Sequence, residues 1–558
     1  MSLTARRRQS ATSSTRVDET GGLGSRRRWR VWPVAWNTSP AGDCDLTFAP
    51  EPITGRPTPV VPVDGAPLPA SHARHPAALG DDAGGGAPFP LTPNQLAIWT
   101  HEALFPNTPA YTIGGCFRLA PGVDAARIIA VLQRVVESHE ALRLRFRETP
   151  DGPRQYVAPL DGYAQENGPG DDSAFGIMPR QDGNDWDRLI GFELCRPFDL
   201  LDKPLFRFNV LEREPSAGHL LLIILHHLIG DFSSIDLIVR DLEQSNLGLS
   251  PGEATPFSRA ALGQAPEPPA KQPSLGQSWR QAGHLNTHAA ARDNQYWTRQ
   301  LGPLVQAGAA KAARLPRPAA PRFVGFEVRR RLSPALTARV RALAGRFAVT
   351  PYILTMAAFL LIEGWETGRR RQIITTTMDL RDRPDLRNTM GYLVNILPLG
   401  VEWEDELSFH ALCVLVQDAF RRALPHRKLP FAQLVRDLRL VRDAGAQPLS
   451  QVLFTWLKFD AGFGHDHVGK MFVDTYVPAR NLRAGITHDV VLTVEDRLDT
   501  YECCWRFDED LFQPAKAQEV AGRYQRLLET LDDSGNALLG DLFQTLCRGE
   551  AANESFEL

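Results

Sequence analysis

The pattern of hydrophobic and polar positions predicts a buried strand that leads directly into a helix. Residues 221–225 form an unbroken apolar run, which is typical of a strand buried on both faces. Beyond it apolar residues recur at helical spacing, and Ser233 followed by Asp236 has the form of a capping box. A helix is therefore expected to begin just after Ser233, with an apolar face formed by Ile235, Ile238, Val239 and Leu242.

Two adjacent histidines, His226 and His227, occupy the connection between this strand and this helix. Imidazole is the side chain whose pKa lies closest to neutrality, so it can serve as a general base. Because neighbouring side chains on an extended segment point to opposite sides, only one of the two can face a given cavity. Two other interpretations stay open. Both rings are hydrogen-bonded parts of the structure, or they bind a metal, although no further ligands follow at metal-binding spacing.

Other hydrophobic periods predict helices with well-marked starts. Ser, Thr or Asp caps a helix N-terminus, and proline suits the first helical position. Four such starts are Thr92-Pro93, Asp124, Ser333-Pro334 and Thr350-Pro351. The helix after Thr350 is apolar nearly all round and is expected to be buried.

Composition divides the chain into an extension and two folded units. Residues 1–88 carry arginine clusters and a Pro-, Gly- and Ala-rich stretch, which predicts a disordered extension. Residues 249–290 are rich in Pro and Gln, as expected of a linker. In the second unit a buried strand is predicted over residues 372–380, and a helix over residues 513–531 is expected to close the fold.

The overall composition excludes several classes of protein. A net charge of −3 gives no reason to expect nucleic-acid binding. The seven cysteines show no C-x-x-C spacing, which favours a reducing compartment over a disulfide framework. The longest apolar run, residues 356–362, is far shorter than the roughly 20 residues needed to span a bilayer. We therefore expect a soluble cytoplasmic protein, a monomer that binds neither nucleic acid nor membrane.

The pattern His226-His227-x-x-x-Asp231 resembles the signature of the condensation-domain superfamily of non-ribosomal peptide synthetases. Other motifs of that family recur in the expected order over about residues 90–545. They are matched by Thr92 to Trp99, Ser138 to Phe146, Gln295 to Leu301, Met390 to Leu399, His426 to Phe431 and Pro448 to Phe454. No adenylation pattern and no carrier-protein serine motif occurs, so the resemblance is to a free-standing condensation enzyme.

The resemblance implies an α/β fold of two chloramphenicol-acetyltransferase-like lobes that form a V around a central active-site tunnel. On this basis residues 89–265 are expected to form the N-terminal lobe and residues 266–545 the C-terminal lobe. Residues 546–558 would be a tail.

The resemblance also assigns roles to individual residues. His227 is the expected base, and the catalytic motif further contains His226 and Asp231. Asp231 is expected to form an ion pair with Arg381, and Asn395 is expected to support the site. The helix N-terminus at Ser234 is expected to supply amide groups for a developing oxyanion. His139, in another motif, is expected to stabilise the fold.

The implied donor is an acyl thioester on the phosphopantetheine of an acyl or peptidyl carrier protein, and the chain itself would bind no cofactor or metal. The acceptor would be an amine or a hydroxyl, either on a small molecule or on a second carrier. The reaction would therefore form an amide or an ester in non-ribosomal peptide or hybrid polyketide biosynthesis.

Two departures from the family pattern bear on the acceptor. Phe232 stands where the family usually has glycine, and Gly400 stands where it usually has arginine. They favour a chain specialised for an unusual, compact acceptor. Two alternatives remain. One is a catalytically degenerate module that recruits carrier or tailoring proteins, which the intact histidine motif and Arg381 disfavour. The other is a carrier-independent acyltransferase with an alcohol acceptor.

Overall fold

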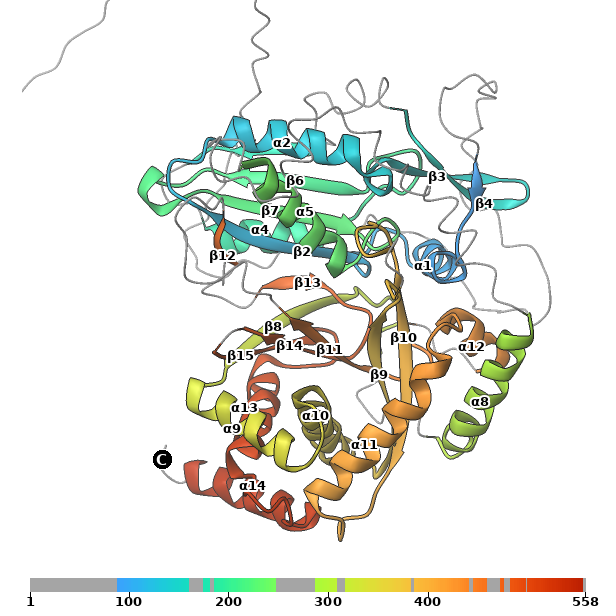
Figure 1. The fold of residues 1–558 in the computed structure, drawn as a ribbon, viewed down its shortest axis with the longest axis vertical. Coiled ribbons are helices and arrows are strands. Elements are labelled where there is room, and N and C mark those ends of the chain that lie inside the picture. The colour runs from blue at the N-terminus through green and yellow to red at the C-terminus, as the bar shows by residue number, and fades with distance from the viewer. Residues whose placement is uncertain are drawn as a thin grey trace, which may run out of the picture.

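The computed structural model describes residues 88–159, 174–180, 185–246, 287–308, 317–382, 386–440, 445–458, 472–475, 482–497 and 499–554. The predictions for residues 1–87 and for most of the linker lie outside these ranges. The described residues form two α/β lobes, drawn above and below one another in Figure 1. The predicted two-lobe α/β fold is thus confirmed.

The first lobe is built on a five-stranded sheet with the order β12-β2-β7-β6-β5. Its central strand, β7 (Leu220–His226), has every residue buried, as the apolar run predicts. The two faces of the sheet pack in separate hydrophobic clusters, which explains why no position of β7 is polar before the histidine. The other elements of this lobe are β1 (Phe89–Pro90), α1 (Pro93–Leu104), β2 (Thr112–Leu119), α2 (Ala125–Ser138), β3 (Leu144–Thr149), β4 (Gly152–Val157), β5 (Phe175–Met178), α4 (Trp186–Cys195), β6 (Phe206–Leu211) and α5 (Phe232–Asn246).

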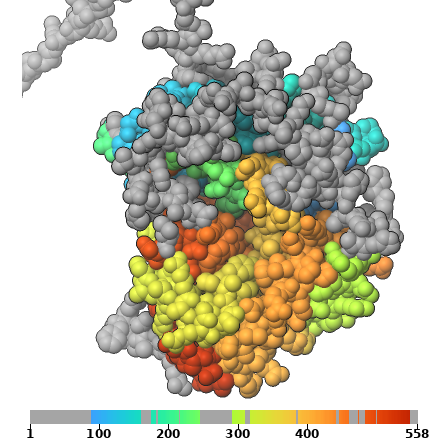
Figure 2. Space-filling model, viewed as in Figure 1, coloured from blue at the N-terminus to red at the C-terminus, as the bar shows by residue number. Residues whose placement is uncertain are grey.

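The second lobe is built on a seven-stranded sheet with the order β10-β9-β11-β14-β15-β8-β13. Its strands are β8 (Val324–Arg331), β9 (Arg371–Asp379), β10 (Val394–Glu402), β11 (Val452–Lys458), β13 (Arg483–Gly485), β14 (Val490–Asp496) and β15 (Tyr501–Asp508). Its helices are α8 (Thr287–Gln306), α9 (Pro334–Arg346), α10 (Pro351–Thr367), α11 (Phe409–Ala423), α12 (Phe431–Asp437), α13 (Pro514–Thr530) and α14 (Leu539–Glu554). In the space-filling view this lobe, coloured yellow to red, fills the lower half of the face (Figure 2).

The four predicted helix starts are confirmed. Thr92 forms a full capping box with Gln95 at the start of α1. The side chains of Asp124, Ser333 and Thr350 accept hydrogen bonds from first-turn amides of α2, α9 and α10. The predicted burial of α10 is also confirmed, because its residues from 353 to 364 are all buried in the core of the second lobe.

The predicted start of α5 is wrong by two residues. The helix begins at Phe232, and its cap is Asp231, whose Oδ1 accepts a hydrogen bond from Ser234 N at 3.0 Å. Ser233 donates its hydroxyl hydrogen to Asp379 Oδ2 at 3.0 Å instead. An ionised carboxylate is a stronger acceptor than a hydroxyl, so Asp231 caps the helix in place of Ser233.

The second lobe differs from its expected limits in two places. α13 matches the helix predicted over residues 513–531, but α14 follows it and crosses the expected boundary at residue 545. Leu539, Leu542 and Leu546 of α14 are buried in the core, so this helix belongs to the lobe rather than to a tail. In addition, β12 (Phe472–Thr475) leaves the second lobe and pairs antiparallel with β2 of the first.

Among the described residues no single helix is both long enough and apolar enough to cross a bilayer. Taken together, α9 and α10 are long enough and apolar enough to cross a bilayer, but the two helices meet at a bend of 100°.

Candidate active site

The turn between β7 and α5 is held tightly against the first lobe. The His227 backbone N–H donates to Tyr111 O at 2.9 Å, and Ile229 N donates to His226 O at 3.0 Å. A Cβ at Gly230 would lie 2.9 Å from Leu225 Cδ1, so a larger residue there would have to displace the end of that side chain. Backbone hydrogen bonds therefore fix the conformation of the histidine motif.

The two histidines point to opposite sides, as predicted. His226 is 2% exposed, and its Nδ1 accepts a hydrogen bond from Leu228 N at 3.2 Å. That acceptor role leaves the ring proton on Nε2, which lies 3.5 Å from Glu102 Oε1 of α1. His226 is therefore part of the interior of the first lobe and holds the turn in shape.

His227 is half-buried and keeps one ring nitrogen open. Its Nδ1 lies 3.0 Å from Gly230 O, and a carbonyl oxygen can only accept, so Nδ1 carries the proton. Among the described residues nothing hydrogen-bonds to Nε2, whose lone pair is then available to take a proton. The ring of Tyr392 meets the His227 ring edge-on, with centroids 5.4 Å apart.

Burial lowers the pKa of His227 to about 4, because the surrounding protein disfavours the charged imidazolium. The hydrogen bond to Gly230 and the charge of Asp231 act in the opposite sense but are smaller effects. At neutral pH the ring is therefore uncharged, which is the state that a general base requires.

The predicted ion pair between Asp231 and Arg381 is present and buried. Arg381 Nη1 donates to Asp231 Oδ2 at 2.8 Å, and Nη2 donates to Oδ1 at 3.0 Å. The side chains are only 1% and 5% exposed. The carboxylate also accepts hydrogen bonds from Ser234 and from Leu393 N. These partners occupy both oxygens, so Asp231 holds the turn in shape and makes no hydrogen bond to the imidazole.

The same arginine joins the first lobe to a loop of the second lobe. Arg381 Nη2 donates to Gly391 O at 3.1 Å, and Gly391 N donates to Ser234 Oγ at 3.2 Å. Gly391 has a φ of 142°, a conformation that favours glycine. This loop carries Tyr392 to the ring of His227, so the environment of the expected base is formed by both lobes.

Asn395 makes four side-chain hydrogen bonds. Its Nδ2 donates to Arg427 O and Leu429 O, both at 2.7 Å. Its Oδ1 accepts from Phe431 N at 3.0 Å and from Asn94 Nδ2 at 3.1 Å. These contacts tie β10 to α1, to α12 and to the segment just before α12, and the supporting role of Asn395 in the site stays a prediction.

The expected source of oxyanion stabilisation is wrong in part. Ser234 N donates to Asp231 Oδ1, and Ile235 N donates to Asp231 O at 3.3 Å. Because the cap lies at Asp231, these amides are already used within the first turn of α5. They are therefore not open to a developing charge.

The two departures from the family pattern have different structural settings. A Cβ at Gly400 would lie 2.2 Å from Leu304 Cδ1, so a longer side chain there would have to displace the end of the Leu304 side chain of α8. Phe232 is 39% exposed and lines a cavity of about 410 Å³ between the lobes. Gly400 thus faces the side chain of Leu304, whereas Phe232 faces a space that a ligand can enter.

Three further residues complete the picture. His139 Nε2 lies 2.6 Å from Asp241 Oδ2 of α5, in keeping with its predicted stabilising role. Glu102 and Tyr392 were missed by the sequence analysis. Tyr392 falls at an unspecified position of a matched motif, and Glu102 faces the polar edge of His226 from a helix without any motif residue at that position. No three His, Cys, Asp or Glu side chains gather into a possible metal site within the described ranges.

Comparisons with known proteins agree on one family. The model of the condensation domain matches residues 87–546. The phosphinothricin tripeptide synthetase PhsC from Streptomyces viridochromogenes is 28% identical over 462 residues, which covers 80% of this chain and 39% of PhsC. This chain therefore spans well under half the length of that curated relative.

Solved structures share the fold. The first condensation domain of the CDA synthetase has a TM-score of 0.63 at 20% identity, covering 82% of this chain and 98% of that domain. The X-domain from teicoplanin biosynthesis, solved in complex with OxyB, has a TM-score of 0.62 at 22% identity, covering 82% of this chain and 96% of the X-domain. At these identities the likeness shows the fold alone.

Proposed function

Because the chain belongs to the condensation-domain family, we propose that it transfers an acyl group from the phosphopantetheine thioester of a carrier protein to an amine or a hydroxyl. The observation that carries this proposal is the open Nε2 of His227. The ring is uncharged at neutral pH, is oriented by Gly230 O, and lies where loops of both lobes meet. The acceptor is either carried by a second carrier protein or supplied as a free small molecule.

The proposed chemistry balances as a simple acyl transfer. The nucleophile attacks the thioester carbonyl while His227 Nε2 takes its proton, and a new C–N or C–O bond forms. The C–S bond then breaks, and the imidazolium returns the proton to the leaving sulfur to give the free thiol of the carrier. A positioned base contributes about 10²–10⁴-fold, and holding two large substrates together contributes further through orientation.

The rival function is recruitment without chemistry. It gains support from the X-domain, which was solved in complex with OxyB. A recruiting module has no use for an unprotonated imidazole nitrogen held open, or for a buried ion pair that fixes the turn behind it. Those two features favour catalysis.

The experiment that tests the function supplies an acyl-loaded carrier protein together with a panel of amines and alcohols. Liquid chromatography with mass spectrometry identifies each product as an amide or an ester. Formation of at least one product at a rate well above the enzyme-free reaction is expected. Stable binding of the loaded carrier with no product from the whole panel would instead favour recruitment.

We expect the transfer rate to follow the unusual pKa of His227. With a hydroxyl acceptor, which does not itself titrate in this range, the rate should rise with pH through about 4 and stay level from about 5 to 7. The neutral imidazole is the active form, and the lowered pKa keeps it neutral down to that pH. Thioester hydrolysis without enzyme is the control. A rate that still rises between pH 6 and 7 would show an ordinary histidine pKa and contradict the proposed environment.

We further propose that the acceptor is a discrete small molecule and that Phe232 favours it. A bulky side chain at the edge of the inter-lobe cavity leaves less room for a long carrier-bound arm. The change Phe232→Ala should therefore raise the rate with a carrier-loaded acceptor relative to the same acceptor supplied free, by about tenfold.

The matched control is Phe192→Ala, which removes another exposed phenylalanine of the first lobe that does not line the cavity. Both variants are assayed with one acceptor in its free and carrier-loaded forms. If wild-type enzyme uses only the loaded form, the small-molecule proposal is wrong and chain extension between carriers takes its place.

A further inference from the structure

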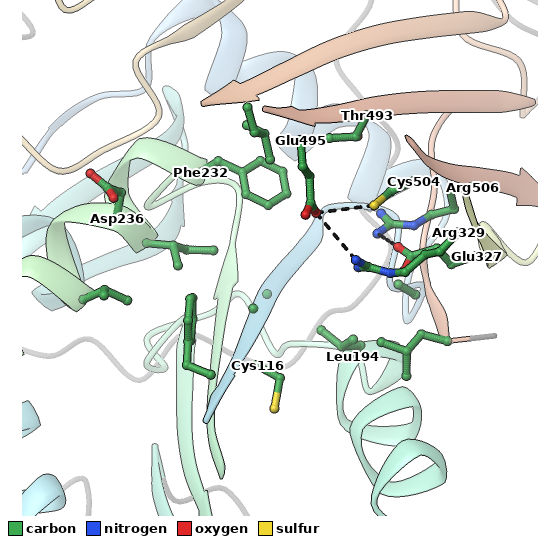
Figure 3. A pocket seen from close by; sticks show the side chains of 18 of the residues that line it. Cys116, Leu194, Phe232, Asp236, Glu327, Arg329, Thr493, Glu495, Cys504 and Arg506 are labelled. Atoms are coloured by element: carbon green, nitrogen blue, oxygen red, sulfur yellow. Dashed lines mark hydrogen bonds and ion pairs between the residues drawn. The ribbon is translucent and has the colours of Figure 1, made fainter. Parts of the chain in front are cut away.

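The cavity next to Phe232 has two unlike walls. The first lobe contributes a mostly apolar wall that includes Gly115, Ile235 and Val239, with the polar side chains of Ser233 and Asp236 also lining it. The second lobe contributes charged and polar side chains from β8, β14 and β15, which Figure 3 shows pointing into the same space. His227 does not line this cavity, but Phe232 follows Asp231 directly, so the cavity begins within one helical turn of the histidine motif.

The charged wall is one face of the second sheet. Arg329 of β8 pairs with Cys504 of β15, which pairs with Thr493 of β14, and Glu327 pairs with Arg506 in the next row of that face. Burying charges between two lobes is costly unless each is paired, and an apolar face would pack there at lower cost. The charged face therefore calls for an explanation beyond packing.

The carboxylates of this face have their partners within the protein. Glu327 accepts hydrogen bonds from Arg329 Nε at 2.5 Å and from Arg506 Nη2 at 3.4 Å. Glu495 accepts from Arg497 at 2.5 Å and from the Cys504 thiol at 3.4 Å. Both acids are therefore occupied and do not call for a cation.

The guanidinium of Arg329 is only partly used. Its Nε binds Glu327, but its terminal Nη1 is 3.7 Å from Glu495 Oε1 and 3.6 Å from Glu502 Oε1, beyond hydrogen-bond distance. Its two terminal nitrogens donate no hydrogen bond to any described residue. The Nε of Arg506 is likewise buried without a partner in the described part of the chain. The wall thus offers spare donors and no spare acceptor of equal strength.

From these spare donors we propose that the cavity binds a carboxylate through Arg329, and that this carboxylate belongs to the acceptor. The inference rests on the proposed acyl transfer, with the nucleophilic end of the acceptor reaching past Phe232 to His227. A planar guanidinium holds a carboxylate by two parallel hydrogen bonds. Glu327, Glu495 and Glu502 balance Arg329, Arg497 and Arg506 in charge. The cavity is also lined by Asp236, Asp379 and Lys458, so selectivity comes from this geometry and not from excess positive charge.

A binding experiment tests the site without relying on transfer. Isothermal titration calorimetry compares succinate with succinamide, two probes of similar size that carry no amine or hydroxyl nucleophile. Wild-type protein should bind succinate at least about tenfold more tightly than succinamide. Arg329→Lys should remove that preference, because lysine keeps the positive charge but cannot donate two parallel hydrogen bonds to a carboxylate. Equal binding of the two probes, or an unchanged preference in Arg329→Lys, overturns the proposal.

The control variant is Arg331→Lys. Arg331 lies two residues along the same strand and contacts Glu502 at 3.5 Å, but it does not line the cavity. Both changes keep every positive charge, so the neighbouring glutamates stay paired and unfolding temperatures should remain close to wild type. A loss of succinate preference in Arg331→Lys as large as in Arg329→Lys would locate the effect outside the cavity and contradict the proposal.

A transfer experiment then identifies the source of the carboxylate. Carrier-bound octanoyl and carrier-bound succinyl donors are each assayed with 4-aminobutanoate and with 4-aminobutanamide. Arg329→Lys should lower transfer to 4-aminobutanoate about tenfold and leave 4-aminobutanamide unaffected with the octanoyl donor. An effect confined to the succinyl donor assigns the site to the acyl chain and refutes its role in acceptor binding. Succinate binding that depends on Arg329, without transfer to any acceptor, would support the carboxylate site. It would contradict only the proposed acyl transfer.

Discussion

Replacing His227 with alanine is expected to lower acyl transfer by about 10²–10⁴-fold while leaving the protein folded. The ring makes one side-chain hydrogen bond, to Gly230 O, so its loss removes a base without opening the core. The residual rate should reflect orientation of the two substrates. The measurement is initial transfer rate at saturating carrier thioester, together with circular dichroism to verify the fold.

The matched control is His226→Ala, which removes the neighbouring imidazole from the interior of the first lobe. Its ring accepts from Leu228 N and packs against Phe198, so its loss should mainly lower the free energy of unfolding. Any loss of activity should be recovered at lower temperature. Near-wild-type turnover in a folded His227→Ala protein would mean that the site works by orientation alone or through another base.

Removing one partner of the buried ion pair is expected to have the largest effect on stability. Arg381→Ala leaves the Asp231 carboxylate buried and uncompensated, and should lower the free energy of unfolding by about 3–5 kcal/mol. The pair joins the histidine turn to the loop at Gly391, so activity should fall as well. Urea unfolding followed by fluorescence measures the first effect.

The comparison for this prediction is an exposed ion pair. Arg346 and Asp533 form a contact at 2.7 Å with side chains 57% and 66% exposed, so Arg346→Ala should change stability far less. Asp231→Asn should behave like Arg381→Ala because it strands the guanidinium instead. Equal, small effects of Arg381→Ala and Arg346→Ala would argue that the buried pair does not support the turn.

The sequence predicted those parts of the fold that depend on local patterns. The apolar run before His226 identified β7, and Thr92, Asp124, Ser333 and Thr350 marked helix starts because capping is a contact within one turn. The pairing of Asp231 with Arg381, 150 residues apart, could be predicted only from resemblance to a family.

Features that depend on contacts between distant segments could not be predicted. Nothing in the residues of β12 indicates that it leaves one lobe to pair with β2 of the other. The contact of Tyr392 with His227 depends on the loop held by Arg381. The spare donors of Arg329 appear only when three strands are placed side by side, since each arginine alone resembles an ordinary surface residue.

The most direct test of the central claim is to follow the carrier protein itself. Intact-protein mass spectrometry records an acyl-phosphopantetheinyl carrier mixed with acceptor and with either wild-type enzyme or His227→Ala. Wild-type enzyme should convert the acyl carrier to the free thiol form while acylated acceptor accumulates in equal amount. His227→Ala should do so at least about 100-fold more slowly. Equal discharge by both proteins, or none by either, would contradict the central claim.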